Sequence, residues 1–152
     1  MSAPFEIREG SIDEAIEVCR RVPELESARP EEFVRRLDQP SASILIAAPA
    51  ARGAALVAFK AGYDRYRDGS FYSWLGGVAP EARGCGLAAA LIDRQEAWAR
   101  QKGYARIHVK TRNRFVAMHV LLAKKGYLLV SVDAPSPDTP LDELRLSFVK
   151  AL

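Results

Sequence analysis

The sequence predicts an α/β fold in which a single domain, residues 1-152, carries a mixed and mostly antiparallel sheet flanked by about four helices. Two strand candidates, 43–48 and 54–60, are separated only by a short segment with a proline and a glycine, which is typical of an antiparallel hairpin. A strand over 71–78 is followed by a helical pattern and then by a strand over 105–111. Such a crossover makes the two strands parallel neighbours. A chain of 152 residues suits one domain.

The first elements are a strand and two helices. Residues 5–7 alternate between apolar and charged side chains, as a short strand does. Ser11 and Glu14 have the spacing of a capping box, so a helix is expected to begin there and to end before Pro23. Pro30 opens a second short helix, because proline is well suited to the first helical turn.

The middle of the chain reads as a three-strand meander, 43–48, 54–60 and 71–78, with an exposed polar loop over 63–69. This loop is a candidate for touching a substrate, and its acids Asp64 and Asp68 hint at a cationic one. Gly76 and Gly77 lie inside the third strand, where glycine marks a bulge or the close approach of a ligand to the backbone.

The last third predicts a helix from Leu87 to about Lys102, the strand 105–111, one more helix and two closing strands over 128–132 and 144–149. Asn113 is a candidate N-cap of the last helix and Gly126 its end. Three side chains of that helix are expected to face inward: Ala117, Val120 and Leu121.

Composition narrows the function classes. The net charge is only +3, with basic residues spread along the chain, so nucleic-acid binding is not expected. No apolar run reaches membrane-spanning length, and the first ten residues lack the apolar core of a signal peptide. Two cysteines, Cys19 and Cys85, suggest neither a disulfide framework nor a metal site. These features predict a cytoplasmic protein without membrane or metal.

The stretch from Val78 to Leu87 carries the clearest signal of function. It ends a strand and opens a helix through Gly84 and Gly86. The first amides of a helix have no intrahelical acceptor, and the helix dipole adds partial positive charge there. Glycine lets an anion come close to those amides, and Arg83 adds a cation. The stretch therefore predicts a phosphate-binding loop; the alternative is a tight connection without a ligand.

The run Val78 to Ala88 resembles motif A of the GNAT superfamily of N-acetyltransferases, a pattern of Arg or Gln, two residues, Gly, one residue, and Gly or Ala. Arg83, Gly86 and Ala88 occupy those three positions. The order of the expected elements follows the family along nearly all of the chain, including a helix that ends in Gly126 and Tyr127. The resemblance implies a GNAT-like fold whose central pair of parallel strands splays apart.

What the resemblance implies for the site is acetyl-CoA (coenzyme A), bound with its diphosphate on the glycine loop and its pantetheine arm between the splayed strands. Another family residue, an Asn after the second parallel strand, has a counterpart in Asn113 unless that residue is a helix cap. The implied cofactor-binding residues are Arg83, Gly84, Gly86, Leu87 and Ala88 for the diphosphate, Gly76 and Val78 for the pantetheine arm, and Asn113.

The reaction implied is attack by a neutral amine on the thioester, with proximity and carbonyl polarisation supplying the acceleration. Many family members protonate the leaving thiolate with a tyrosine, but this chain has Leu122 at that position. His119, one turn earlier, is the candidate catalytic acid, with a surface histidine as the alternative. Two candidates remain for the general base that deprotonates the amine: Tyr72, or a water molecule ordered by an acid of the 63–69 loop. His108, Trp74 and Trp98 are read as packed residues.

Two other functions compete with this one. Gly84 to Ala89 also fits a dinucleotide-binding glycine pattern, although the antiparallel meander before it disagrees with that fold. A non-catalytic acyl-CoA-binding module is the second alternative, because of Leu122. The acceptor is expected to be a small-molecule or protein amine, and the family resemblance makes a homodimer plausible.

Overall fold

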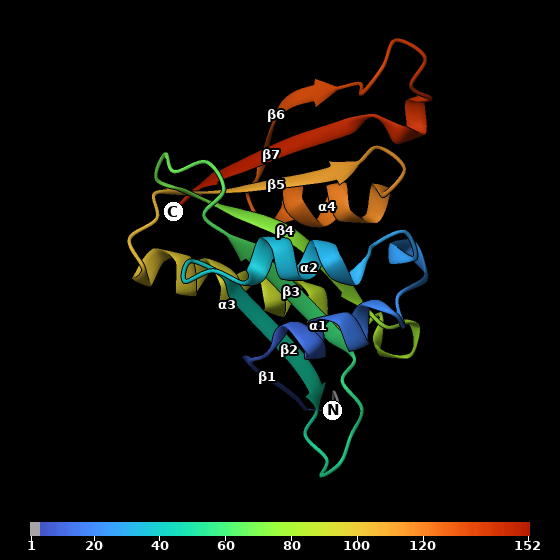
Figure 1. The fold of residues 1–152 in the computed structure, drawn as a ribbon, viewed down its shortest axis with the longest axis vertical. Helices are drawn as coiled ribbons and strands as arrows, with labels where there is room; N and C mark the ends of the chain where they lie inside the picture. The colour runs from blue at the N-terminus through green and yellow to red at the C-terminus, as the bar shows by residue number, and fades with distance from the viewer. Residues whose placement is uncertain (1–3) are drawn as a thin grey trace.

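One mixed sheet of seven strands organises the fold (Figure 1), in the order β1-β2-β3-β4-β5-β7-β6. The structure is a computed structural model that describes residues 4–152. The strands are β1 (Phe5–Glu9), β2 (Ser43–Pro49), β3 (Ala58–Tyr63), β4 (Ser70–Val78), β5 (Arg106–Arg112), β6 (Leu128–Asp133) and β7 (Arg145–Ala151). The helices are α1 (Ile12–Cys19), α2 (Pro30–Leu37), α3 (Leu87–Gln101) and α4 (Val116–Lys124), with short 3-10 turns η1 (Pro23–Leu25), η2 (Pro80–Ala82) and η3 (Leu141–Glu143). This order of elements confirms the predicted fold class.

The helices cover the two faces of the sheet. Figure 1 shows α1 and α2 in front of the sheet and α3 and α4 behind it. Phe33 of α2 packs on Phe59 of β3 in the front core, whereas Phe71 of β4 packs with Ile92 of α3 and Ile107 of β5 in the rear core. Successive side chains of a strand point to opposite faces, so β3 and β4 feed both cores.

The predicted helix starts near the N-terminus are confirmed. Ser11 Oγ accepts a hydrogen bond from Glu14 N at 3.1 Å, and Glu14 Oε1 accepts one from Ser11 N at 3.0 Å, which completes the capping box of α1. Pro30 is the first residue of α2, as expected. No helix of residues 4–152 combines the length and apolarity that a bilayer crossing requires.

Strands β4 and β5 are parallel, as predicted, but they pair over four residues only, from Ser70 opposite Arg106 to Ser73 opposite Val109. The pairing of β3 with β4 shifts register at the next residue, so Trp74 has no cross-strand partner. A bulge bends the strand that carries it. The bulge thus lies where β4 turns away from β5. The sequence had suggested a bulge at Gly76 and Gly77, but these pair regularly with Lys60 and Phe59.

Three other local predictions were wrong. Strand β3 runs over Ala58–Tyr63 rather than 54–60, because residues 50–56 form the turn. Asn113 does not cap α4, which begins at Val116 after Phe115. Of the side chains expected to face inward on α4, Ala117 and Val120 are exposed, and Leu121 is the one that packs against the core. The apolar side chains of the segment are spread around the helix rather than gathered on one face, so periodicity could not identify its buried face.

Candidate functional site

A cleft of about 870 Å³ opens where β4 and β5 part. Its walls come from the end of β4, the end of β5, the first turns of α3, the inner side of α4 and the segment around η1. Beyond Ser73 and Val109 the facing edges of the two strands no longer pair with each other. Their main-chain groups are therefore free to bond to an extended ligand.

The glycine loop closes one end of this cleft. Gly84 and Gly86 have positive φ angles of 81° and 79°, a conformation that other residues adopt at a cost. Among the described residues, the amides from Gly84 to Ala89 have no main-chain acceptor. Gly84, Gly86, Leu87 and Ala88 all line the cleft. The structure thus brings together the open amides that the sequence indicated, at the start of a fifteen-residue helix.

Arg83 also lines the cleft, and it is held from two sides. Its Nε donates to Val78 O at 3.0 Å, and its Nη2 lies 2.5 Å from Glu24 Oε2 of η1. Both side chains of this ion pair remain more than two-fifths exposed. The guanidinium therefore stands at the mouth of the loop with a carboxylate beside it.

The two adjacent glycines of β4 allow close packing on opposite faces. A Cβ on Gly77 would lie 3.0 to 3.1 Å from Val22 and Leu25, so glycine lets the η1 segment approach the strand. A Cβ on Gly76 would lie 3.1 Å from Phe59 O and 3.4 Å from Lys60 Cγ. Both glycines line the cleft. The absence of side chains at these two positions lets neighbouring residues pack close to β4 where it borders the cleft.

Comparison with known proteins now separates the candidate functions. The model of the Acetyltransferase (GNAT) family matches residues 11–127. The chain belongs to the GNAT acetyltransferase family. The match spans most of the residues that form the cleft, and it confirms the resemblance seen in the glycine loop. A dinucleotide-binding fold is excluded by the same match and by the antiparallel strands β1 to β4.

Solved structures show the same fold at low sequence identity. The ribosomal-protein-S18-alanine N-acetyltransferase from Escherichia coli has a TM-score of 0.80 and 14% identity, over 97% of this chain and 94% of that one. A Bacillus subtilis acetyltransferase in complex with CoA has a TM-score of 0.75 and 14% identity, over 98% and 99%. A protein from Bacillus anthracis described as a streptothricin acetyltransferase, in complex with acetyl-CoA, has a TM-score of 0.66 and 19% identity, over 78% and 66%. No curated protein matches the sequence as a relative.

In this GNAT protein two predicted site residues, His119 and Asn113, do not line the cleft, and neither does Leu122, which holds the position of the family's tyrosine. His119 Nε2 lies 3.1 Å from Arg112 O, and its ring packs near Phe148. Asn113 donates from Nδ2 to Leu141 O at 2.9 Å and so anchors the loop before β7. Leu122 is completely buried in the rear core. None of the three lines the cleft; the residues of α4 that do are Val116, Ala117, Met118 and Leu121.

The candidate bases are also engaged elsewhere. Asp64 accepts from Arg67 N and Tyr104 Oη, and Asp68 accepts from Ser70, so both acids serve the loop itself. Burial raises the pKa of Tyr72, so even less of its basic phenolate form is present at neutral pH. None of the three lines the cleft. The hint of a cationic acceptor drawn from these acids therefore loses its basis.

His108 is packed, as predicted. It stacks on Tyr66 with ring centroids 5.1 Å apart, and its pKa is lowered, chiefly by burial. Trp74 meets the prediction only in part: it packs edge-on against Phe33, but it also lines the cleft.

Sequence reasoning missed Lys60, a buried lysine of β3 that lines the cleft. Burial lowers the pKa of its ammonium to about 8. The one available signal was a charge inside the otherwise apolar run from Ala58 to Tyr63. A lysine in a buried strand needs an explanation, because lysine is almost never fully buried without a partner.

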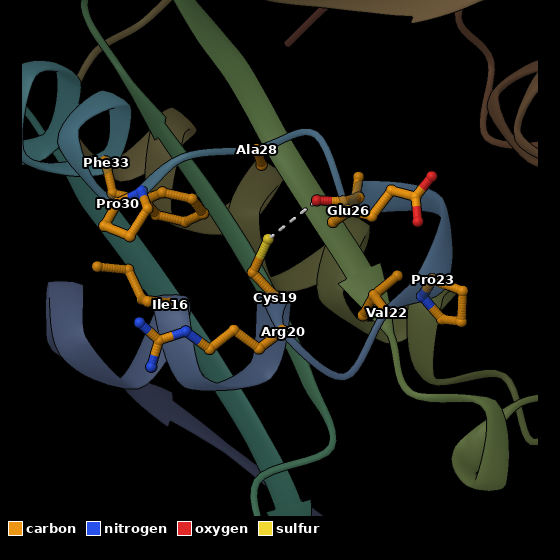
Figure 2. Close-up of a pocket in the computed structure, with 10 residues that line it drawn as sticks. Ile16, Cys19, Arg20, Val22, Pro23, Glu26, Ala28, Pro30 and Phe33 are labelled. Atoms are coloured by element: carbon orange, nitrogen blue, oxygen red, sulfur yellow. Dashed lines mark hydrogen bonds between the residues drawn. The ribbon is translucent and has the colours of Figure 1, made fainter.

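A second hollow of about 370 Å³ lies on the other side of the η1 segment. Figure 2 shows its lining, with Cys19 Sγ directed at Leu25 O, 3.9 Å away. Burial raises the pKa of the Cys19 thiol, which leaves it protonated and unreactive. Leu25 and Ala28 line both hollows, so the segment between them separates this pocket from the cleft.

Proposed function

We propose that this protein transfers the acetyl group of acetyl-CoA to a primary amine by direct attack of the amine on the thioester. The observation that carries the proposal is the separation of β4 from β5 beyond Ser73 and Val109, with the open amides of α3 at the far end of the gap. A site of this shape suits an elongated ligand that is anionic at one end. Membership of the GNAT family and the fold shared with proteins solved in complex with CoA or acetyl-CoA support the choice of ligand.

The diphosphate is assigned to the amides of Gly84, Gly86, Leu87 and Ala88, with Arg83 beside them. Helix N-termini hold phosphate through main-chain donors and the helix dipole. The pantetheine arm follows β4 past Val78 and Gly76, where the edge of the strand is unpaired. Asn113 and His119 take no part in this assignment, because neither lines the cleft and each side chain is bonded to a main-chain carbonyl.

Holding the acyl donor and the amine in one cleft supplies much of the acceleration, since reaction between bound partners avoids the entropy cost of their encounter. The attacking amine must be neutral. It reaches the carbonyl from the face covered by α1 and α2, because the glycine loop and α3 occupy the other. The acceptor is a small molecule or an exposed amine of a protein.

Two measurements test the proposal. Calorimetry measures acetyl-CoA binding, and a thiol-release assay over a panel of amines measures transfer. Binding together with amine-dependent release of CoA is expected. Binding without release for any amine would support a non-catalytic acyl-CoA module instead, and no binding would overturn both functions.

A matched pair of variants locates the binding site. Gly86→Glu places a carboxylate against the open amides and is expected to abolish acetyl-CoA binding with the fold intact. Gly103→Glu is the control: Gly103 lies just past the other end of α3, also has a positive φ, and has free space around it. Both variants carry the same backbone strain, so equal loss of binding in the two would remove the loop from the site.

A further inference from the structure

Lys60 reaches the cleft from a neighbouring strand. It belongs to β3, and β4 lies between β3 and β5. Lys60 pairs in register with Gly76, whose missing side chain leaves room for the Lys60 stem: a Cβ at residue 76 would touch Lys60 Cγ at 3.4 Å. Lys60 lines the cleft while only 6% of its surface is exposed. Its amine is thus delivered across β4, on the α3 side of the sheet.

The ammonium of Lys60 has no direct partner. Among residues 4–152 its Nζ forms no hydrogen bond and no ion pair with protein atoms, and the atom keeps some contact with the open cleft. Glu96 of α3 is the acid that attracts it, but Glu96 already accepts from Tyr127 Oη at 2.9 Å and from Lys150 Nζ at 2.8 Å. A largely desolvated ammonium without a protein partner is costly, so Lys60 is a candidate for a functional group.

The other groups around Lys60 do not neutralise it. From β4, Ser73 shares the cleft with Lys60 and presents a buried hydroxyl without a partner, which carries no charge. The charged side chains that share the cleft are Glu24, Arg83, Lys110, Arg112 and Arg114. Glu24 is paired with Arg83, so the cleft holds no unpaired acid among the described residues.

Lys60 enters the cleft between the glycine loop and the place where the reacting sulfur is expected. From Val78, next to the glycine loop, to Ser73, where the strands meet, β4 advances about 17 Å at 3.3 to 3.4 Å per residue. An extended pantetheine arm that starts at the loop spans a similar distance and brings its sulfur close to the point of divergence. Lys60, opposite Gly76, enters the cleft between these two ends, three residues of β4 from Ser73, and its flexible four-carbon side chain can cover part of the remaining distance to the sulfur.

Resting on the proposed function, we propose that Lys60 is the catalytic acid that protonates the departing CoA thiolate. The amine nitrogen forms a bond to the carbonyl carbon, the C–S bond breaks, and its electron pair stays on sulfur. Lys60 Nζ gives this sulfur a proton and becomes a neutral amine. The proton that the attacking nitrogen loses passes to solvent, and Lys60 takes one back before the next turnover.

The residue fills a role that this chain otherwise leaves empty. The position of the family's tyrosine holds Leu122, which faces the rear core, and His119 is directed at Arg112 O. An ammonium with its pKa lowered to about 8 gives up a proton more readily than an ordinary lysine, whose pKa is 10.5. The ammonium form nevertheless predominates at neutral pH.

Ultraviolet titration of the thiol in the CoA complex tests the inference without knowledge of the acceptor. An opposite charge within reach lowers a pKa by about 1 to 3 units. We expect the CoA thiol to ionise at least about one unit lower in the wild-type complex than free in solution, and Lys60→Met to abolish that shift. Lys124→Met, on the exposed end of α4, is the control and should leave it unchanged.

Lys60→Arg separates charge from proton transfer. Arginine keeps the positive charge and thus the lowered thiol pKa, but it does not give up its proton. The rate of thiol release is therefore expected to be lower than wild type in Lys60→Arg, as it is in Lys60→Met. Equal thiol pKa values in the wild-type and Lys60→Met complexes would overturn the role of Lys60 while leaving the proposed function intact. Failure of the wild type to bind CoA in calorimetry would overturn both.

Discussion

Replacing Glu24 by glutamine is expected to tighten the binding of acetyl-CoA. Glu24 forms an ion pair with the guanidinium of Arg83 at 2.5 Å and lines the cleft. A diphosphate on the glycine loop must compete with this carboxylate for Arg83 and is repelled by its charge. The neutral amide of Glu24→Gln removes both effects and keeps the shape of the side chain.

The geometry of the pair sets the magnitude. Arg83 and Glu24 are 43% and 41% exposed, so solvent screens their interaction, and exposed pairs contribute about 0.2 to 1 kcal/mol. Binding of the diphosphate breaks the pair in the wild type and so costs this free energy. The Glu24→Gln variant has no ion pair to break, so its complex is more stable by that amount. Since 1.4 kcal/mol is a factor of ten, affinity should rise about 1.4-fold to 5-fold.

Calorimetry at low and at high salt measures the effect, and the gain should shrink as salt rises because the charges are exposed. Glu26→Gln is the matched control: Glu26 lies two residues further on, is exposed, and lines the second hollow rather than the cleft. It should change affinity by less than Glu24→Gln. Weaker binding in Glu24→Gln, or an equal gain in the control, would refute a role for Arg83 at the diphosphate.

Four further predictions concern individual side chains. Leu122→Tyr, which restores the family's tyrosine, should destabilise the rear core by about 1 to 3 kcal/mol in denaturant unfolding and leave thiol release no faster, because residue 122 does not face the cleft. Asn113→Ala should cost about 1 kcal/mol of stability and leave acetyl-CoA affinity unchanged in calorimetry. Hydrogen bonding to Arg8 lowers the pKa of Glu14 to about 2. The stability that ionised Glu14 contributes is therefore complete above its ordinary pKa of 4.5 and is lost as pH falls toward 2. In Glu14→Gln the free energy of unfolding should depend less on pH in that range. Lys60→Met should raise unfolding stability at neutral pH, and the gain should diminish between pH 8 and 10.5, where the unfolded chain alone keeps the proton of the wild-type lysine.

The sequence was most informative where local chemistry decides the structure. The capping box at Ser11 and Glu14, the proline that opens α2 and the glycines at 84 and 86 each act through their own backbone or nearest neighbours, and each lies where it was expected. The parallel pairing of β4 and β5 also followed, because a strand-helix-strand crossover leaves few alternatives.

Features that depend on contacts between distant residues could not be read in the same way. Asn113 has the form of a helix cap, yet it bonds to Leu141, twenty-eight positions away. The approach of Lys60 across Gly76 depends on the register between two strands, which the pattern of single strands does not specify. The orientation of α4 depended on packing, since its apolar side chains are spread around the helix.

The segment from Val22 to Ala28 separates two hollows. One side borders the cleft and the other borders the hollow of Figure 2, which separates it from α1 and the start of α2. Val22, at the start of the segment, is buried in the same core as Phe33 and Phe59, whereas Leu25 and Ala28 line both hollows. A change in side-chain size at Leu25 or Ala28 should therefore alter the cleft and the second hollow together.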